Sequence, residues 1–317
     1  MASTTFLTLP SGKRMPQLGL GTWLSPPGIV QGAIEFAIKN GYRHIDCAYL
    51  YENEQAIGEG FAKVLKECPV KRDELFITSK LWNAYHAPED VKPACMESMK
   101  MLQLDYLDLY LMHSPMSIKN VKGELMPQKD GKILQTDVDY VDTWKAMEKL
   151  VDEGLVKSIG VANFNKCQLE RLISAARIKP DVLQVERHPF QTQKTLVAFT
   201  KSKGMAMTAY SPLTSPESPF LSGLKNGMEE PVVKEIAKKH GKSPAQILIR
   251  FNIQCGIATI PKSQTPAHII ENTKVFDFCL TDEEMKKLES LHCGARAVPW
   301  DLLGLGTHKH YPFSKDE

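Results

Sequence analysis

Four side chains with complementary acid–base chemistry stand at or just after the ends of three consecutive apolar segments. They are Asp46 at the end of 43–46, Tyr51 five residues later, Lys80 at the end of 75–80 and His113 directly after 106–112. If the three segments are neighbouring strands, which lie about 4.8 Å apart, their ends bring these side chains to one rim. Each residue alone has an ordinary explanation, such as a loop cap, a solvated lysine or a packed histidine. Together they supply a proton donor, a cation, a counter-ion and a group that orients a substrate.

The chemistry that fits these residues is general acid catalysis by Tyr51 without a metal. A tyrosine hydroxyl has an ordinary pKa of about 10 and is a poor proton donor at neutral pH. We expect the cation of Lys80 to lower that pKa, and the carboxylate of Asp46 to keep the lysine charged. His113 can form a hydrogen bond to a carbonyl oxygen beside Tyr51. The sequence therefore predicts a proton donor tuned toward working pH.

The elements that must position these residues repeat eight times along the chain. Short apolar segments alternate with longer amphipathic stretches that read as helices. The predicted strands are 18–23, 43–46, 75–80, 106–112, 156–163, 182–186, 205–211 and 256–261, and the clearest helices are 28–41, 88–102, 141–154, 165–177 and 192–204. Alternating strands and helices predict a parallel sheet. Eight units favour a closed barrel over an open sheet.

An open dinucleotide-binding sheet would carry the motif GxGxxG after its first strand. The segment LGLGTW (18–23) has only two glycines, so this alternative is disfavoured. We therefore expect an α/β fold, a (β/α)8 TIM barrel, with residues 1–317 in one domain. Two long polar loops, 117–138 and 212–230, follow the fourth and seventh strands, at the face where barrel enzymes keep their sites. The aperiodic tail 292–317 could cover the same face.

Composition narrows the class of protein. The formal net charge of +2 argues against a nucleic-acid partner. The start of the chain does not read as a secretory signal, and no run of 18 apolar residues predicts a membrane span. Seven scattered cysteines without a CxxC pair favour free thiols and a cytoplasmic location. The histidines of HKH (308–310), with His292 and Cys293, match no zinc spacing, so no metal site is expected.

Several longer motifs are spread along the whole chain. The longest is GYRHIDCAYLYENEQAIG (41–58). The others are ITSKLWN (77–83), LYLMH (109–113), GVANFN (160–165), LQVERHP (183–189), TAYSPL (208–213), IPKS (260–263) and HKHYPF (308–313). Together these motifs resemble the aldo-keto reductase family, and its aldose and aldehyde reductases most of all. The resemblance implies a monomer that reduces aldehydes and ketones with NADPH. Tyr51 would be the proton donor, Lys80 and Asp46 would tune it, and His113 would orient the substrate carbonyl.

The resemblance also implies an extended cofactor site. Asn163 and Gln184 would hold the carboxamide, and Tyr210 would stack on the nicotinamide ring. The pocket beside the ring would be bordered by Gly21, Thr22, Trp23 and Asp46. Ser211, Leu213 and Ser215 would line the pyrophosphate path. The adenosine end would be held by Lys262, Ser263, Glu271 and Asn272, with His268 near the 2′-phosphate. The substrate would contact Trp23, Tyr51, Trp82 and His113.

The adenosine end also follows from the residues themselves. Thr265 is a suitable N-cap and Pro266 a suitable first helical residue. A helix N-terminus beside Lys262 and Ser263 would attract an anion. The alternative is an ordinary capped helix with one surface lysine.

Three positions depart from the family pattern. Ala162 stands where the family has serine, so one hydrogen bond to nicotinamide, worth about 1 kcal/mol, should be missing. His268 stands where the family has an arginine for the 2′-phosphate, which predicts a weaker and pH-dependent preference for NADPH. Ser114 replaces a tryptophan, which should widen or wet the pocket. Trp300 could be a further wall, although rim packing explains it better.

Two other functions remain open. The chain could be a nicotinamide-binding sensor that does no chemistry, a reading that Ala162 and His268 favour faintly. It could also be a barrel lyase that forms a Schiff base on Lys80. The carboxylate of Asp46 argues against the lyase, because it keeps the amine protonated. The presence of His113 favours carbonyl reduction over the reduction of steroid double bonds, for which relatives replace that histidine.

Overall fold

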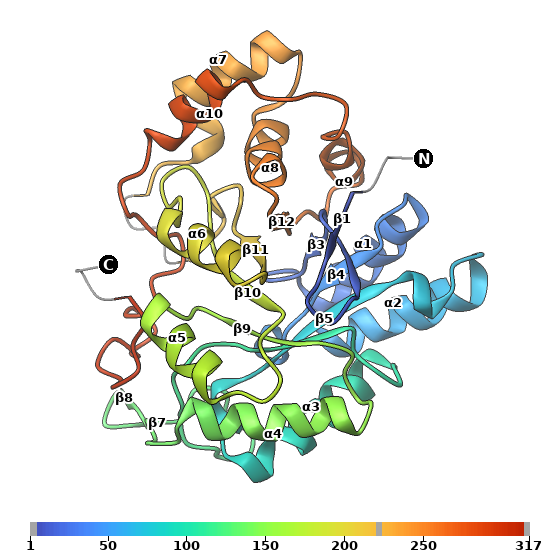
Figure 1. The fold of residues 1–317 in the computed structure, drawn as a ribbon. Helices are drawn as coiled ribbons and strands as arrows, with labels where there is room; N and C mark the ends of the chain where they lie inside the picture. Colours follow the sequence, from blue (N-terminus) through green and yellow to red (C-terminus); the bar gives the residue numbers. More distant parts are fainter. Residues whose placement is uncertain (1–4, 220–223, 314–317) are drawn as a thin grey trace.

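The computed structural model describes residues 5–219 and 224–313. Its central feature is a barrel of eight parallel strands in the order β3-β4-β5-β6-β9-β10-β11-β12 (Figure 1). The strands are β3 (Leu20–Gly21), β4 (His44–Asp46), β5 (Phe76–Leu81), β6 (Leu109–Met112), β9 (Ile159–Ala162), β10 (Val182–Glu186), β11 (Ala206–Tyr210) and β12 (Ala258–Thr259). All eight predicted strands are present, most of them shorter than predicted.

The barrel closes between the first and last strands. Parallel bridges join Leu18 to Thr259 and Gly21 to Lys262. At this seam a Cβ atom on Gly21 would lie 2.7 Å from the carbonyl oxygen of Ile260, closer than real Cβ atoms come to backbone. Glycine is therefore required where the two ends of the sheet meet. The predicted (β/α)8 fold is confirmed.

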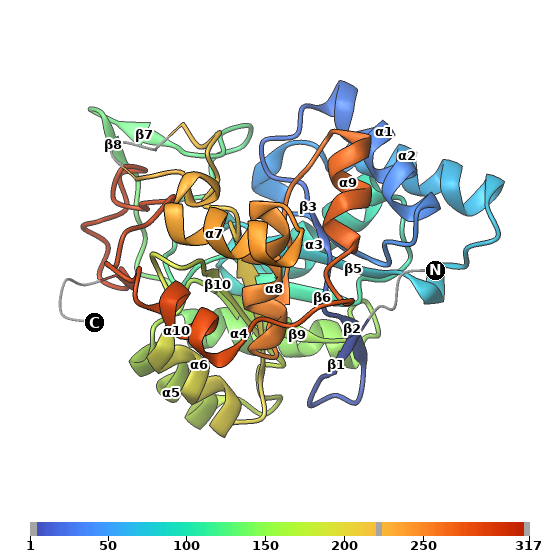
Figure 2. The ribbon, with the colours of Figure 1, turned by 90° about the horizontal axis from the view of Figure 1, so that it is seen from above.

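The helices form a layer around the strands, which Figure 2 shows from above. They are α1 (Pro27–Lys39), α2 (Glu54–Glu67), α3 (Pro88–Leu102), α4 (Tyr140–Asp152), α5 (Lys166–Ala175), α6 (Lys194–Ser202), α7 (Pro231–His240), α8 (Pro244–Gln254), α9 (Pro266–Thr273) and α10 (Asp282–Glu289). Short 3-10 turns are η1 (Tyr49–Tyr51), η2 (Arg72–Glu74), η3 (Asn83–Tyr85) and η4 (Gly227–Glu229). The five predicted helices are confirmed. Gly154 and Gly204 follow two of them with positive φ, as their terminating role requires.

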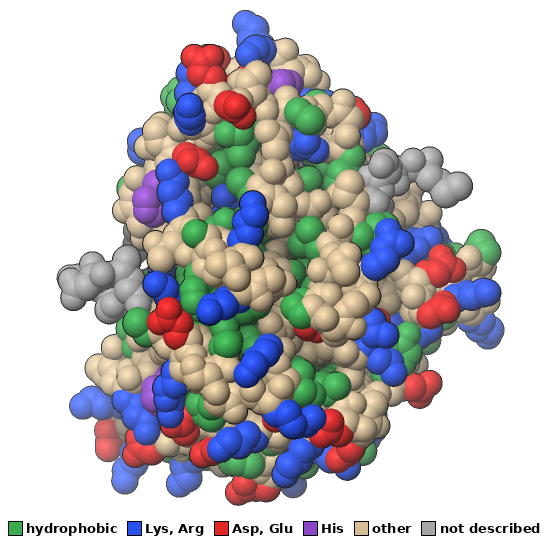
Figure 3. Space-filling model, in the orientation of Figure 1, with side chains coloured by type: hydrophobic (Ala, Val, Ile, Leu, Met, Phe, Trp, Pro, Cys, Tyr) green, Lys and Arg blue, Asp and Glu red, His purple; other side chains and the backbone are tan. Residues whose placement is uncertain are grey.

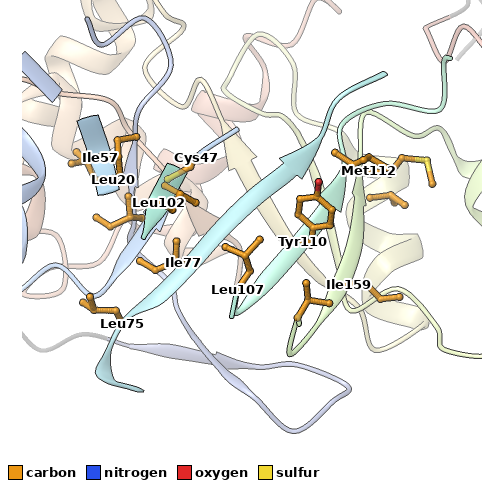
Figure 4. Close-up of a cluster of buried hydrophobic side chains, with 14 of the residues drawn as sticks. Leu20, Cys47, Ile57, Leu75, Ile77, Leu102, Leu107, Tyr110, Met112 and Ile159 are labelled. Carbon is orange, nitrogen blue, oxygen red and sulfur yellow. The ribbon is translucent and has the colours of Figure 1, made fainter. Parts of the chain in front are cut away.

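Alternate residues of each strand face the barrel interior and the helices. Ile77 of β5 and Tyr110 of β6 lie in the outer cluster with Ile57 of α2 and Leu102 of α3 (Figure 4). Phe76 and its inward-facing neighbours instead pack at the N-terminal end of the barrel with Leu9 and Met15. Leu9 and Met15 belong to the hairpin of β1 (Phe6–Thr8) and β2 (Arg14–Pro16), which the sequence did not predict.

The loop 117–138, residues 212–219 of the second long loop and residues 292–313 of the tail meet over the opposite end of the barrel. The loop 117–138 contains a small hairpin, β7 (Gln128–Lys129) and β8 (Lys132–Ile133), that was not predicted. Its Ile118 and Ile133 share an apolar cluster with Trp82 and with Val298 and Trp300 of the tail. The tail is also fixed by His308, whose Nε2 lies 3.1 Å from the carbonyl oxygen of Ser117. The tail therefore covers the barrel face where the predicted site lies.

Over the face shown in Figure 3, basic and acidic side chains lie interspersed, in agreement with the small net charge. In the described part of the chain, the helices are all too short or too polar to span a bilayer.

Candidate active site

Asp46, Lys80 and Tyr51 form a connected group in the mouth of the barrel. Lys80 Nζ lies 2.5 Å from Asp46 Oδ1, 2.9 Å from the carbonyl oxygen of Cys47 and 3.3 Å from the hydroxyl of Tyr51. The side chains of Lys80 and Asp46 are only 1% and 2% exposed. The lysine therefore joins the carboxylate to the tyrosine hydroxyl within the protein interior.

The strands explain why these side chains converge. Asp46 is opposite Thr78 in the β4–β5 register, and Lys80 is opposite Leu111 in the β5–β6 register. Because strand side chains alternate, Asp46 and Lys80 both point inward, as do Thr78 and Leu111. Tyr51 ends the 3-10 turn that follows β4. Its ring lies edge-on to that of His113, with 5.9 Å between the ring centroids.

Burial and charge oppose each other at the lysine and the tyrosine. Burial acts to lower the pKa of Lys80, but Asp46 and Tyr51 outweigh it and hold that pKa above its ordinary value. Burial raises the pKa of Tyr51 to about 12, although Lys80 opposes this rise. The prediction that Lys80 lowers the tyrosine pKa toward neutrality is therefore wrong: the cation offsets only part of the cost of burying a tyrosinate. The prediction that Asp46 keeps the lysine charged is confirmed.

His113 is neutral at physiological pH. Burial holds its pKa well below the ordinary value, and the charge of Lys80 lowers it further. Three aromatic rings surround the imidazole edge-on: Tyr51, Trp82 and Trp300, at centroid distances of 5.9, 5.5 and 5.9 Å. The ring is therefore fixed in orientation and offers a hydrogen bond without adding charge.

One cavity of about 880 Å³ runs from these residues toward α8 and α9. Every residue predicted to contact the cofactor lines it. They are Gly21, Thr22, Trp23, Asp46, Asn163, Gln184, Tyr210, Ser211, Leu213, Ser215, Lys262, Ser263, His268, Glu271 and Asn272. Tyr51 and His113 line the same cavity, whereas Lys80 lies behind its wall.

Two amides are fixed at the barrel end of the cavity. Asn163 donates from Nδ2 to the carbonyl oxygen of His113 at 2.9 Å and accepts the hydroxyl of Tyr210 at 2.8 Å. Its φ of +60° is unusual for a residue with a side chain, and asparagine adopts it more readily than most. Gln184 donates from Nε2 to Asp46 Oδ2 at 2.7 Å. These contacts hold both amides in fixed positions at the cavity wall.

The far end of the cavity carries features that attract anions. Lys262 lines it and pairs with Glu217, with 2.5 Å between Nζ and Oε2. The N-termini of α8 and α9 also open onto it, through Ser243 and Thr265. Thr265 and Pro266 hold the predicted N-cap and first helical positions, but the threonine side chain makes no capping hydrogen bond. Helix N-termini beside a lysine are suited to phosphate groups.

Comparison with known proteins identifies the family. A sequence profile of the aldo/keto reductase family matches residues 17–292. The chain belongs to the aldo/keto reductase family. It is therefore an oxidoreductase, and the prediction of an enzyme of the NADP-dependent reductase class is confirmed.

Relatives match over nearly the whole chain. Aldo-keto reductase family 1 member A1 of Gallus gallus is 46% identical, covering 99% of this chain and 98% of that protein. The protein of the same name from Homo sapiens is 47% identical, covering 94% and 92%. Among solved structures, the aldose reductase of Schistosoma japonicum matches with a TM-score of 0.92 and 44% identity, over 99% of this chain and 100% of that one.

The tryptophans of this aldo/keto reductase lie differently from the prediction. Trp23 lines the cavity as expected. Trp82 does not; it is fully buried behind His113 and donates from Nε1 to the carbonyl oxygen of Leu125 at 2.7 Å. Its predicted contact with the substrate stays a prediction. Trp300, expected as rim packing, instead lines the cavity beside His113.

Ser114 does not line the cavity of this aldo/keto reductase. The residue is fully buried and is absent from the cavity wall. Its hydroxyl donates to Asn83 Oδ1 at 2.9 Å and accepts the amide of Met116 at 3.2 Å. A pocket wider or wetter than that of relatives with a tryptophan here stays a prediction. Ala162 ends β9 just before Asn163, and the loss of one hydrogen bond there stays a prediction.

Sequence reasoning missed part of the substrate end. Leu50, Val298 and Leu303 line the cavity beside Trp23 and form an apolar wall. Leu50 stands next to Tyr51 and could have been found from that position. Val298 and Leu303 lie in the aperiodic tail, where no spacing marks an inward-facing residue.

Proposed function

We propose that this aldo/keto reductase reduces aldehydes and ketones to alcohols with NADPH, and that Tyr51 donates the proton. When bound, NADPH supplies the hydride that the carbonyl carbon accepts. The observation that carries the proposal is the position of the Tyr51 hydroxyl, at the wall of the cavity and 3.3 Å from a charged, buried lysine.

The protein's part of the reaction is the delivery of one proton. With a pKa of about 12, Tyr51 is protonated at neutral pH and is ready to donate. As negative charge develops on the carbonyl oxygen, the proton moves from Tyr51 to that oxygen. The resulting tyrosinate is stabilised by Lys80, which Asp46 keeps positive. Such stabilisation matters most in the transition state, where it accelerates the step.

His113 positions the oxygen that receives the proton. Its neutral ring lies beside Tyr51 at the cavity wall, so one carbonyl oxygen can accept hydrogen bonds from both. A neutral donor avoids placing a second buried cation next to Lys80. The apolar wall of Trp23, Leu50 and Trp300 excludes water and suits an apolar small-molecule substrate.

The residues present fit a nicotinamide dinucleotide. The fixed amides at one end of the cavity suit its polar ring. The central path past Ser211 and Ser215 suits the pyrophosphate, and Lys262 with two helix N-termini at the other end suits the phosphorylated ribose. Family members generally use NAD(P)H. We propose a preference for NADPH because Lys262 and His268 both line the adenosine end. The preference should be modest, since a histidine lacks the forked donors with which an arginine binds phosphate.

The two other functions fit less well. A lyase needs an accessible, uncharged amine, whereas Lys80 is 1% exposed, ion-paired and outside the cavity wall. A sensor without chemistry would not need the Tyr51–Lys80–Asp46 group. The seven cysteines are free thiols, which fits the proposed cytoplasmic location. We also propose that the chain acts as a monomer with one domain.

The deciding experiment follows NADPH consumption with 4-nitrobenzaldehyde for the unmodified protein and for Tyr51→Phe. We expect turnover to fall by about 100-fold or more in the variant, with NADPH binding retained. Equal turnover in both proteins would refute Tyr51 as the donor. Binding of NADPH without turnover in either would support the sensor.

A further inference from the structure

A fully buried carboxylate outside the reacting group holds the tail onto the barrel. Glu186 ends β10 and lies opposite Tyr210 of β11 in the register of the sheet. Its Oε1 accepts the backbone amide of Ala297 at 2.5 Å, and its Oε2 accepts that of Val298 at 3.1 Å. Nε2 of the buried His188 lies 2.8 Å from the same Oε1. The carboxylate thus clamps two consecutive residues of a segment without helix or strand.

The clamped residues lead directly into the substrate wall. Val298 itself lines the cavity, and Trp300 follows two residues later, with its ring beside His113. Ala297 is held from its other side too, since its carbonyl oxygen accepts the hydroxyl of Ser218 at 2.9 Å. Of these hydrogen bonds, the two that Glu186 accepts connect the tail to the barrel sheet.

A carboxylate is well suited to this task. Burial alone raises the pKa of Glu186, but His188 and the amide of Ala297 outweigh it and hold that pKa below its ordinary value. The group is therefore ionised at neutral pH, and its hydrogen bonds to the two amides are charge-assisted. The backbone hydrogen bonds donated by residues 302–305 are local turns within the tail, so they do not connect it to the barrel sheet.

We propose that Glu186 is a positioning residue that fixes the apolar wall of Val298 and Trp300, and so determines that the enzyme favours aldehydes carrying an apolar ring over small ones. The preference rests on the carbonyl reduction proposed above. The clamp itself does not, because the position of the tail can be measured without turnover.

The chain offers a matched control. Glu148 of α4 is also buried, and its Oε1 accepts two consecutive amides, those of Arg177 and Ile178, at 2.7 and 2.9 Å. This second clamp lies on the helical layer and holds no residue of the cavity wall. Glu148→Gln therefore repeats the chemical change of Glu186→Gln at a site that should not affect the pocket.

The first readout is amide hydrogen exchange in the absence of any ligand. We expect Glu186→Gln to accelerate exchange across residues 296–305 by about tenfold or more, and Glu148→Gln to leave those residues unchanged. The second readout is KM for 4-nitrobenzaldehyde and for propanal. For Glu186→Gln we expect KM for the aromatic aldehyde to rise by about tenfold, and KM for propanal by less than about twofold.

Unchanged exchange in residues 296–305 would overturn the clamp, whatever the activity. Faster exchange with an unchanged ratio of the two KM values would overturn the role in substrate preference. If Glu186→Gln does not fold, Ala297→Pro removes the same hydrogen bond from the tail side, because proline has no amide hydrogen. It should then give the same exchange and the same KM ratio. An unmodified protein that reduces neither aldehyde would count against the proposed function, while the exchange result would still decide the clamp.

Discussion

The amine of Lys80 lies 2.5 Å from the carboxylate of Asp46, and both groups are almost fully buried. Removing one partner leaves the other as an unpaired buried charge, which typically costs about 3–5 kcal/mol. The pair therefore affects both the stability of the barrel and the electrostatic environment of the Tyr51 hydroxyl. Single and double substitutions should separate these two roles.

Lys80→Met should lower both stability and turnover. We expect the free energy of unfolding to fall by about 3–5 kcal/mol and kcat by about 100-fold or more. The double variant Asp46→Asn/Lys80→Met removes both charges, so it should recover much of the stability and none of the activity. Urea denaturation and steady-state kinetics measure the two effects. Recovery of activity in the double variant would contradict the role of the lysine.

The preference for NADPH over NADH should depend on the side chain at position 268. His268 lines the adenosine end of the cavity, where an arginine would supply a permanent charge and a forked pair of donors for phosphate. His268→Arg should therefore raise the ratio of the NADH to the NADPH dissociation constant. Titration of the unmodified protein and of the variant with each cofactor measures this ratio. An unchanged ratio in the variant would contradict a role of position 268 in cofactor choice.

Glu54 should make stability depend on pH in the opposite direction to an ordinary ion-paired carboxylate. Burial is the main cause that raises its pKa from 4.5 to about 6. A raised pKa means that the folded protein binds this proton more tightly than the unfolded chain, so the stability contributed at low pH is lost as pH rises through about 6.

The change that Glu54→Gln causes in the free energy of unfolding should therefore be more favourable at pH 8 than at pH 4, by up to about 2 kcal/mol. Urea denaturation of both proteins at the two pH values checks this. Ser79, which donates to Glu54 Oε1 at 2.5 Å, can also donate to the glutamine oxygen, so the fold should be retained. If the free energies of unfolding of the two proteins differ by the same amount at both pH values, the carboxyl of Glu54 does not titrate in this range.

The seam of the barrel should be intolerant of a single methyl group. In Gly21→Ala the new Cβ would lie 2.7 Å from the carbonyl oxygen of Ile260, so the seam must open. We expect a loss of about 1–3 kcal/mol and weaker cofactor binding. Gly32→Ala, on the exposed side of α1 with open space around it, should instead raise stability by about 0.5–1 kcal/mol. Thermal unfolding of both variants provides the comparison.

The residues on the strands could be predicted from sequence because their positions follow from periodicity. Asp46, Lys80 and His113 are at or beside strand ends, and parallel strands bring their ends to one edge. The pKa of Tyr51 could not be predicted in the same way. It depends on how completely the surrounding chain excludes water, and spacing along the sequence carries no information about this.

The absence of Trp82 and Ser114 from the cavity wall has a common physical origin. Each directly follows a reacting residue or its strand, and a shift of one or two positions at a strand end decides whether a side chain faces the cavity or the packed interior. The positions of Trp300 and Val298 at the cavity wall could not be predicted for a different reason. They belong to the tail, whose position is determined by individual contacts, such as that of Ala297 to Glu186, and not by a repeating pattern.

The bridge between Gly21 and Lys262 joins segments that are made far apart in time on the ribosome. Thr22 and Trp23 are synthesised long before Trp300 and Leu303, and all four line one cavity. A nascent chain that has not yet reached Leu303 has no complete cavity. Ligands that need the complete cavity therefore cannot stabilise the chain before that point of its synthesis.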